Sequence, residues 1–371
     1  MKQVVISVHI FLLLTSFSYS LQTKYTSIFS FGDSYTDTGN AIIIYGPDKP
    51  DLWINKAPYG MTFFGHPSGR LSDGRLIIDF IADALGLPLL PPSLAANHSF
   101  RQGANFAVAG ATALKRTSYT QAAAGVRIPP TNISLTEQLG WFDAVKPSLC
   151  TSPQACKDYF GKALFVVGEV GFNDYGLMLV AGKSIGEVQS FVPRIVGMIC
   201  AATEKLIKDG GKTIVVSGVS PLGCAPGNLV LLASQNPADY DPATGCLKKL
   251  SLLAKDHNSQ LGQALTELSG RYPGVRIIRA DFFTPIIDFV SSPDRYGFNG
   301  TYGALRCCCG GRGGRYNFNL TAPCGKPGLG IVHGDPSAYV NWDGVHLTEA
   351  AYRRIADSWL KGPYAQPPIL S

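Results

Sequence analysis

Residue types suited to nucleophilic catalysis stand near the two ends of the sequence. Ser34 directly follows Gly32-Asp33 and a short apolar run, which places its hydroxyl on a turn after a strand. A serine hydroxyl is a weak nucleophile at neutral pH and needs a neighbouring base. Asp343 and His346 are three residues apart, so the carboxylate can bond one imidazole nitrogen while the other nitrogen faces a serine. Ser34, Asp343 and His346 are therefore candidates for a nucleophile with its activating pair, although most of the chain separates them.

Each of these motifs taken alone also has an ordinary structural interpretation. Serine is common in turns, and an Asp three residues before a His often caps a helix or contacts solvent. A second candidate nucleophile is Ser184, because residues 182–186 fit the Gly-x-Ser-x-Gly pattern of a nucleophile elbow. No HGGG-type oxyanion motif precedes Ser184, and we therefore favour Ser34.

Two further blocks lie between the serine motif and the Asp-His motif. Residues 103–110 read Gly-Ala-Asn-Phe-Ala-Val-Ala-Gly, and residues 171–174 read Gly-Phe-Asn-Asp. Together with Phe-Gly-Asp-Ser at 31–34 and Asp-Gly-Val-His at 343–346, they follow one another in the order that defines the SGNH/GDSL hydrolase superfamily. The sequence resembles the plant GDSL esterase/lipases of that superfamily along nearly all of its length after residue 20.

The resemblance implies a carboxylic ester hydrolase that forms a serine acyl-enzyme and needs no cofactor or metal. Ser34 matches the nucleophile, His346 the general base, and Asp343 the residue that orients this base. The oxyanion donors would be the backbone N–H groups of Ser34 and Gly110 and the side-chain amide of Asn173.

The substrate is suggested only by the branch of the family that the sequence resembles. Residues 57–64 and 341–352 are similar to a branch that includes acetylated-alkaloid, choline-ester and cell-wall acetyl esterases. We expect removal of a short acyl group, such as acetyl, from a plant metabolite or a cell-wall polysaccharide. Two alternatives stay open: an acyltransferase that passes the acyl group to an alcohol, and an inactive carbohydrate-binding protein. Tyr35 replaces the leucine of the family's naming motif, and we expect it to contact the substrate.

The hydrophobic pattern predicts an α/β fold. Short continuous apolar runs, typical of strands in a buried parallel sheet, alternate with segments whose apolar positions recur every three to four residues. The resemblance makes this a flavodoxin-like, three-layer SGNH-hydrolase sandwich, with a central parallel sheet and long surface loops at 44–75 and 291–340. No repeat or linker divides residues 21–371, which we expect to form one domain. The expected strands are 28–31, 105–109, 163–167, 213–219 and 275–280, and the expected helices are 76–85, 136–145, 185–208, 247–269 and 348–360.

Residues 1–20 have the features of a secretory signal peptide. Lys2 precedes the apolar run from Val4 to Leu14, and Ser18 and Ser20 are the small residues that a signal peptidase reads. The run is shorter than the ~20 apolar residues that span a bilayer, and no later stretch looks long and apolar enough to do so. We therefore expect no stable membrane anchor and a secreted protein of the apoplast or cell wall, with the Golgi lumen and the vacuole as alternatives.

The nine cysteines of an exported chain indicate disulfides. We expect Cys150 to pair with Cys156, Cys224 with Cys246, and Cys324 with one member of Cys307-Cys308-Cys309, and Cys200 to stay a buried thiol. Adjacent cysteines lack the C-x₂-C spacing of zinc sites. Four Asn-X-Ser/Thr motifs are candidate glycosylation sites, at Asn97, Asn132, Asn299 and Asn319.

The charge distribution gives no sign of a nucleic-acid partner. The net charge of +6 comes from 32 basic and 26 acidic residues spread along the chain, without the dense basic runs of a phosphate-binding surface. His66, His98, His257 and His333 fit no metal-ligand pattern. The ester substrate is thus the only partner that we predict, and the sequence gives no indication of the oligomeric state.

Overall fold

The computed structural model describes residues 24–46, 52–119, 132–311 and 313–371, so the expected signal peptide lies outside the described residues. A six-stranded sheet with the strand order β2-β1-β3-β4-β5-β8 forms the centre of the molecule. The first five of these strands are parallel, and β8 pairs with β5 in the antiparallel sense. The strands are β1 (Ser27–Phe31), β2 (Gly103–Asn105), β3 (Ala163–Val167), β4 (Thr213–Ser217), β5 (Arg276–Ala280) and β8 (Ala365–Gln366).

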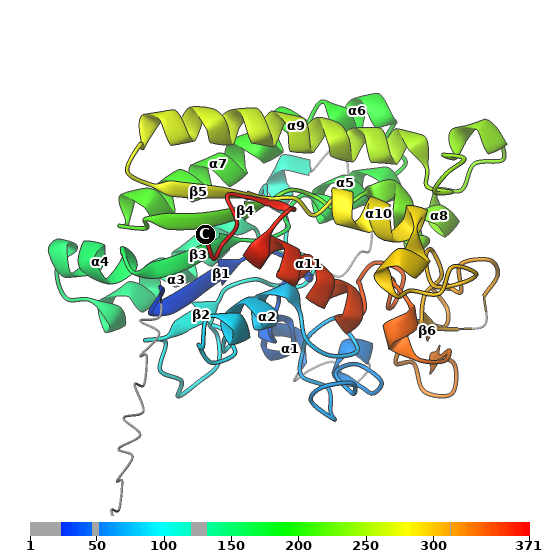
Figure 1. Cartoon of the computed structure of the whole chain (residues 1–371), viewed down its shortest axis with the longest axis horizontal. Coiled ribbons are helices and arrows are strands. Elements are labelled where there is room, and N and C mark those ends of the chain that lie inside the picture. Colours follow the sequence, from blue (N-terminus) through cyan, green and yellow to red (C-terminus); the bar gives the residue numbers. More distant parts are fainter. Residues whose placement is uncertain (1–23, 47–51, 120–131, 312) are drawn as a thin grey trace, which may run out of the picture.

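Helices cover both faces of this sheet, as the sequence predicts (Figure 1). On one face, α7 (Val192–Lys208) packs against α9 (Lys248–Arg271) and α3 (Leu135–Leu149). On the other face, α2 (Ile77–Ala84) packs against α11 (Glu349–Lys361). Every residue of β1, β3 and β4 is buried, which explains why these strands are mainly apolar, with only Ser and Thr as polar residues, instead of alternating apolar with charged residues. The α/β sandwich with a mostly parallel sheet is therefore confirmed.

The strand order places the ends of β1 and β3 at a switch point of the sheet. The chain moves from β1 outward to β2 and then crosses back to β3 on the other side of β1. In doubly wound sheets, ligands bind at such a point, beyond the carboxyl ends of the strands. Here the loops after the two strands touch: Gly168 N–H donates to Phe31 O at 2.7 Å, and Asp33 N–H donates to Glu169 O at 3.2 Å. Ser34 lies in the first of these loops.

Two expected elements differ from the structure for identifiable reasons. The strand expected at 105–109 is shorter and lies earlier, as β2 at Gly103–Asn105. Side chains end it there: Asn40 Nδ2 donates to the carbonyl oxygens of Asn105 and Ala107, and Asn105 Oδ1 accepts the N–H of Ala107. The helix expected at 185–208 is divided into α6 (Ile185–Gln189) and α7, which starts with a proline in its first turn.

Further elements lie in the connections, and the sequence pattern did not predict them. Among them, α5 begins shortly after β3, following the loop that contains Glu169. The strands β6 and β7 form a small antiparallel pair in the excursion at 291–340. These further elements are α1 (Asn40–Tyr45), α4 (Pro153–Phe160), α5 (Phe172–Val180), α8 (Pro226–Leu231), α10 (Thr284–Ser291), β6 (Cys309–Gly310), β7 (Ile331–Val332) and short 3-10 helices at 53–55, 116–119, 222–224, 237–239, 293–296 and 336–338.

Three disulfides have the pairings that the sequence suggested. Cys150 bonds Cys156 and Cys224 bonds Cys246, and the partner of Cys324 is Cys309. Cys200, Cys307 and Cys308 are free thiols. Cys200 is half-buried rather than fully buried. The disulfides are consistent with a chain that matures in an oxidising compartment.

One stretch contradicts the expectation that nothing after the N-terminus could span a bilayer. Among the described residues, Ile185–Lys208 is long and apolar enough by length and composition. In the fold, however, this stretch is interrupted between α6 and α7, and α7 packs on α9, β3 and β4. The apolar residues of α7 therefore pack against the interior of the sandwich.

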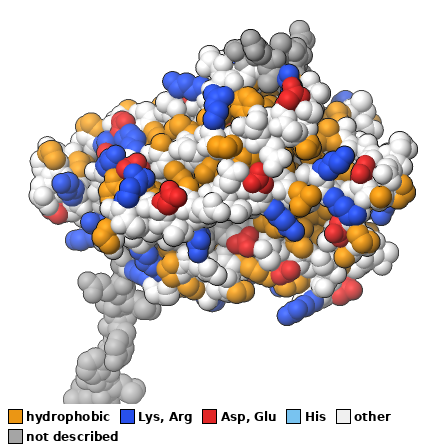
Figure 2. Space-filling model, turned by 90° about the horizontal axis from the view of Figure 1, so that it is seen from above, with side chains coloured by type: hydrophobic (Ala, Val, Ile, Leu, Met, Phe, Trp, Pro, Cys, Tyr) orange, Lys and Arg blue, Asp and Glu red, His pale blue; other side chains and the backbone are white. Residues whose placement is uncertain are grey.

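The charged side chains do not gather into one region on the face shown in Figure 2. Lys and Arg side chains alternate there with Asp and Glu side chains and with small apolar areas. The described residues on this one face thus form no basic stripe of the kind that binds nucleic acid.

Candidate active site

The turn after β1 presents Ser34 at the switch point. Gly32 has φ +150°, and a Cβ atom there would lie 2.8 Å from Thr36 Cγ2 and 3.1 Å from Glu169 O. Only glycine fits this close approach of the two strand ends. The turn is closed by Asp33, whose carbonyl oxygen accepts the N–H of Thr36 and whose Oδ1 accepts the N–H of Tyr35 at 3.0 Å. Ser34 is only 6% exposed.

The structure brings Ser34, His346 and Asp343 together in one chain of hydrogen bonds. Ser34 Oγ lies 2.8 Å from His346 Nε2, although the two residues are 312 positions apart. His346 Nδ1 lies 2.9 Å from Asp343 Oδ1 and 2.8 Å from Oδ2. With the imidazole proton on Nδ1, Nε2 is an acceptor directed at the serine hydroxyl. This is the arrangement in which an imidazole can take the proton of a nucleophilic serine.

The carboxylate of Asp343 is held by its own loop and by a residue from a distant one. Oδ1 accepts the N–H groups of Val345 and His346 at 3.1 and 2.9 Å, and Tyr59 Oη donates to Oδ2 at 2.7 Å. Burial alone would raise the pKa of Asp343, but the adjacent His346 and these hydrogen bonds hold the pKa below its usual value. Asp343 is therefore ionised at neutral pH. The contact of Tyr59 with Asp343 could not be inferred from the sequence, because nothing in the local sequence of Tyr59 connects it to residue 343.

Tyr35 contacts the loop that carries Asp343 and His346. The side chain is buried, and Oη donates to Val345 O at 2.7 Å, between Asp343 and His346. Its ring also packs 5.6 Å from the ring of His346. Tyr35 thus connects the serine loop to the histidine loop, and its contact with substrate stays a prediction.

The second motif block is attached to the serine turn by side chains. Asp37 Oδ2 accepts the N–H of Ala109 at 2.8 Å, and Asn105 Nδ2 donates to Thr36 O at 2.6 Å. Val108 N–H also donates to Gly32 O. These bonds fix the segment that ends at Gly110 beside the turn that carries Ser34.

Asn173, in the first turn of α5, lies against the same turn. Its Nδ2 donates to Asp33 Oδ2 at 3.0 Å and to Ala111 O at 3.0 Å. Both amide hydrogens therefore have acceptors, and the amide plane is held between the serine turn and the second block. An oxyanion near Ser34 would have to share one of these hydrogens or displace an acceptor.

The other candidate nucleophile has a structural role. Ser184 is exposed and caps the N-terminus of α6: its Oγ accepts the N–H of Glu187, and the Glu187 carboxylate accepts the N–H of Ser184. This is a capping box. In the described part of the chain, none of the histidines outside the Asp343-His346 pair is hydrogen-bonded to Ser184. They are His66, His98, His257 and His333.

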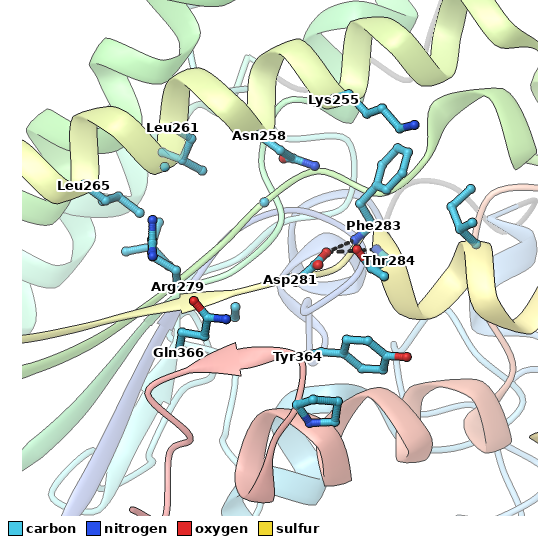
Figure 3. Close-up of a pocket in the computed structure, with 16 residues that line it drawn as sticks. Lys255, Asn258, Leu261, Leu265, Arg279, Asp281, Phe283, Thr284, Tyr364 and Gln366 are labelled. Carbon is cyan, nitrogen blue, oxygen red and sulfur yellow. Dashed lines mark hydrogen bonds between the residues drawn. The ribbon is translucent and has the colours of Figure 1, made fainter.

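A groove of about 600 Å³ lies elsewhere, between α9, the end of β5 and α10 (Figure 3). Arg279, Lys255 and Asp281 give it polar walls, and Leu261 and Leu265 line its α9 side. Ser34 and His346 do not line this groove. Across residues 24–46, 52–119, 132–311 and 313–371, no group of three or more His, Cys, Asp or Glu side chains is arranged to hold a metal ion.

Comparison with known proteins agrees with this geometry. Residues 28–359 match the GDSL-like lipase/acylhydrolase family, a span that contains Ser34, Asn173 and the Asp343-His346 pair. The chain belongs to this family. It is accordingly a GDSL esterase/lipase, an enzyme that hydrolyses carboxylic esters.

Plant members of the GDSL family are similar to this enzyme along most of its length. The Arabidopsis thaliana GDSL esterase/lipase At5g45910 is 45% identical over 349 residues, covering 93% of this chain and 92% of that protein. A second Arabidopsis thaliana protein, GDSL esterase/lipase At1g28610, is 46% identical over 343 residues, with 92% and 87% covered. The sinapine esterase of Brassica napus is 44% identical over 346 residues, with 93% and 87% covered.

Proposed function

We propose that this GDSL esterase cleaves esters through an acyl-enzyme on Ser34, with His346 as general base and Asp343 as its orienting acid. The observation that carries the proposal is the 2.8 Å contact between Ser34 Oγ and His346 Nε2, with the Asp343 carboxylate behind Nδ1. His346 removes the hydroxyl proton as Oγ attacks the ester carbonyl, and then delivers this proton to the departing alcohol. A water molecule, activated by the same imidazole, releases the acid.

Negative charge on the carbonyl oxygen would be stabilised by three donors around the serine turn. They are the backbone N–H groups of Ser34 and Gly110 and the Nδ2 group of Asn173. The proposal is supported by the bonds that hold residues 105–110 and Asn173 against the turn. Loss of one such donor commonly lowers kcat by roughly 10²- to 10³-fold.

For the substrate, we propose a short acyl ester, such as an acetyl ester, of a plant metabolite or a cell-wall polysaccharide. The sinapine esterase among the relatives supports an ester as the substrate. The short acyl group and the kind of alcohol are proposed from the family branch that residues 57–64 and 341–352 resemble. The ratio of acid to transacylated product with and without added alcohols tests hydrolysis against acyl transfer, because an acyltransferase makes the new ester even in excess water.

The decisive experiment compares Ser34→Ala with Ser184→Ala, using hydrolysis of a panel of acetylated glycans and small esters. Ser34→Ala should lower kcat by about 10⁴-fold or more and abolish labelling by a fluorophosphonate probe. Ser184→Ala should keep kcat and lower only stability, by about 1 kcal/mol, because a helix cap is lost. The reverse pattern would overturn the assignment, and a folded wild type that neither labels nor turns over would indicate an inactive binding protein.

We also propose that residues 1–20 are removed during export and that the sequons are glycosylated. Asn97 and Asn132 are exposed and Asn299 and Asn319 are half-exposed, so all four offer accessible side chains. N-terminal sequencing of the mature protein and the mass change after glycosidase treatment test both statements.

A further inference from the structure

Two acidic side chains lie buried directly behind the turn that carries Ser34. Asp33 is 0% exposed and Glu169 is 2% exposed. They follow the neighbouring strands β1 and β3, and Asp33 N–H donates to the backbone carbonyl of Glu169 at 3.2 Å. The mechanism proposed above gives neither carboxyl group a role.

The two carboxyl groups have different hydrogen-bond partners. Both oxygens of Asp33 accept N–H groups, Oδ1 from Tyr35 and Oδ2 from Asn173, each at 3.0 Å. Glu169 accepts one N–H group at Oε1, from Phe172 at 3.2 Å, whereas Oε2 is buried without a partner of normal hydrogen-bond geometry. N–H donors stabilise an ionised carboxylate. Asp33 is therefore the better site for the negative charge, and Oε2 of Glu169 is the place for a proton.

Two neighbouring carboxyl groups in such a buried site do not both ionise at neutral pH. Ile77, Ile81 and Phe282 line a cavity of about 20 Å³ beside Glu169, which has room for about one water molecule. Water can therefore do little to stabilise a second charge. Burial raises the pKa of Glu169 well above its usual value, and the adjacent Asp33 raises it further. Burial raises the pKa of Asp33 only to about 6, because the interaction with Glu169 and the Tyr35 N–H group oppose the rise.

Glu169 also lies next to the residue that it would influence. Its Oε1 accepts the N–H of Phe172, the residue before Asn173 at the start of α5. The Glu169 carboxyl group also interacts with the side chain of Asp33, which accepts the Asn173 side-chain amide. Glu169 therefore contacts the backbone of the residue before Asn173, and it is linked to the Asn173 amide through Asp33.

We propose that Glu169 is a positioning residue, which as a neutral carboxylic acid donates a hydrogen bond to Asp33. This bond keeps Asp33 as the acceptor that orients the Asn173 amide beside Ser34. The inference rests on the proposed function, since it concerns the donor that would meet the oxyanion. Glu169 itself does not touch the substrate.

A pH dependence follows from this arrangement. When Glu169 loses its proton in alkaline solution, two adjacent carboxylates repel each other, the Asn173 amide loses its fixed orientation, and kcat falls. Several other titratable groups interact with the pair, and their charges do not replace this proton. They are His346 and Tyr352 near Asp33, Asp174 and Tyr175 near Glu169, and Tyr35 near both.

The test compares Glu169→Gln with Glu169→Ala in profiles of kcat against pH. Glutamine keeps a neutral donor and cannot ionise, so kcat at pH 7 should stay within about threefold of wild type, and the alkaline decline should disappear. Alanine removes the donor, so kcat should fall by more than about tenfold with little change in KM. The matched control is Glu187→Gln, at an exposed helix cap, which should leave the profile unchanged.

A double-variant cycle separates positioning from simple loss of packing. If Glu169 acts through Asp33, then Glu169→Ala should cost much less kcat when Asp33→Asn is already present. Equal losses of kcat in both backgrounds would overturn the proposal. So would a Glu169→Gln variant as slow as Glu169→Ala, or one that keeps the wild-type alkaline decline. Glu169→Gln decides the matter even where Glu169→Ala does not fold.

A spectroscopic measurement does not depend on turnover. The infrared difference spectrum of wild type minus Glu169→Gln at pH 7 should contain the C=O stretch of one protonated carboxylic acid. A spectrum without this band overturns the proposal. A wild type that shows the band but lacks Ser34-dependent turnover would instead overturn the proposed function.

Discussion

Tyr59 donates a 2.7 Å hydrogen bond from Oη to Oδ2 of Asp343, across 284 positions of sequence. Its ring is fully buried, between Trp53 at 5.7 Å and Trp342 at 5.8 Å. The surface excursion at 44–75 is thereby joined to the loop that carries His346. Partners of this kind, behind the groups that react, set the orientation of a catalytic side chain.

Replacing Tyr59 with phenylalanine should lower kcat about tenfold and leave KM nearly unchanged. A hydrogen bond to a charged group contributes about 1.5–3 kcal/mol. The Tyr59 hydroxyl holds the Asp343 carboxylate in the orientation that directs His346 toward Ser34, so its loss should act on the chemical step. Steady-state kinetics with a short-chain ester check this, with Tyr302→Phe as the control because Tyr302 is 40% exposed. An unchanged kcat in Tyr59→Phe would contradict the role.

Asn173→Ala should lower kcat by roughly 10²- to 10³-fold, because one donor to the oxyanion is lost. KM should change little, since the bond is strongest in the transition state. Asn236→Ala is a suitable control, as this asparagine caps an exposed 3-10 helix. An increase in KM at constant kcat would show that Asn173 binds substrate instead.

The Cys309–Cys324 disulfide should matter for both stability and activity. It closes a loop of 15 residues, for which chain entropy gives a stabilisation of about 3 kcal/mol. The adjoining backbone also holds the active-site loop, because Cys308 and Cys309 N–H groups donate to Asn341 O and Trp342 O. A Cys309→Ala/Cys324→Ala variant should therefore unfold at lower urea concentration and lose kcat several-fold at temperatures where it is folded.

The control for this prediction is the Cys150–Cys156 pair. It closes a loop of only 6 residues, worth about 2 kcal/mol by the same reasoning, and it lies between α3 and α4. Its double alanine variant should lose stability without loss of kcat. Equal kcat in the two double variants would show that the Cys309–Cys324 disulfide does not support the loop that carries Asp343 and His346.

Stability should fall in mild acid because of His257. This side chain is fully buried in α9, with Nδ1 2.7 Å from Tyr175 Oη and Nε2 unpaired, and burial lowers its pKa from 6.5 to about 3. The unfolded chain binds a proton below pH 6.5 and the folded chain does not. The contribution to the free energy of unfolding is therefore complete above pH 6.5 and decreases by about 2 kcal/mol by pH 5.

Urea unfolding of wild type and His257→Gln at pH 7 and pH 5 checks this dependence. The variant should lose about 2 kcal/mol less than wild type between the two pH values, whatever its absolute stability. His98→Gln, at an exposed position, should behave as wild type does. Parallel pH dependence in all three proteins would show that His257 is already protonated in the fold.

The sequence by itself determined the fold class and the residues that meet at the site. The Asp343-His346 pair lies within one turn of chain, and the apolar runs of β3 and β4 are local signals, so the pair and the α/β class could be inferred from spacing. That Ser34 meets this pair was implied by the resemblance to the GDSL family. The boundaries of β2 and the break between α6 and α7 could not, because side-chain hydrogen bonds and packing overrode the local pattern.

Only the tertiary structure decided what surrounds the reacting groups. Tyr59 approaches Asp343, Tyr35 approaches Val345, and Glu169 approaches Asp33 because β1 and β3 are neighbours and the long loops fold back over their ends. These contacts join residues far apart in sequence, and the periodicity of apolar residues along the chain gives no indication of such contacts. Their energies depend on burial, which raises the pKa of Glu169 and which only the folded chain creates.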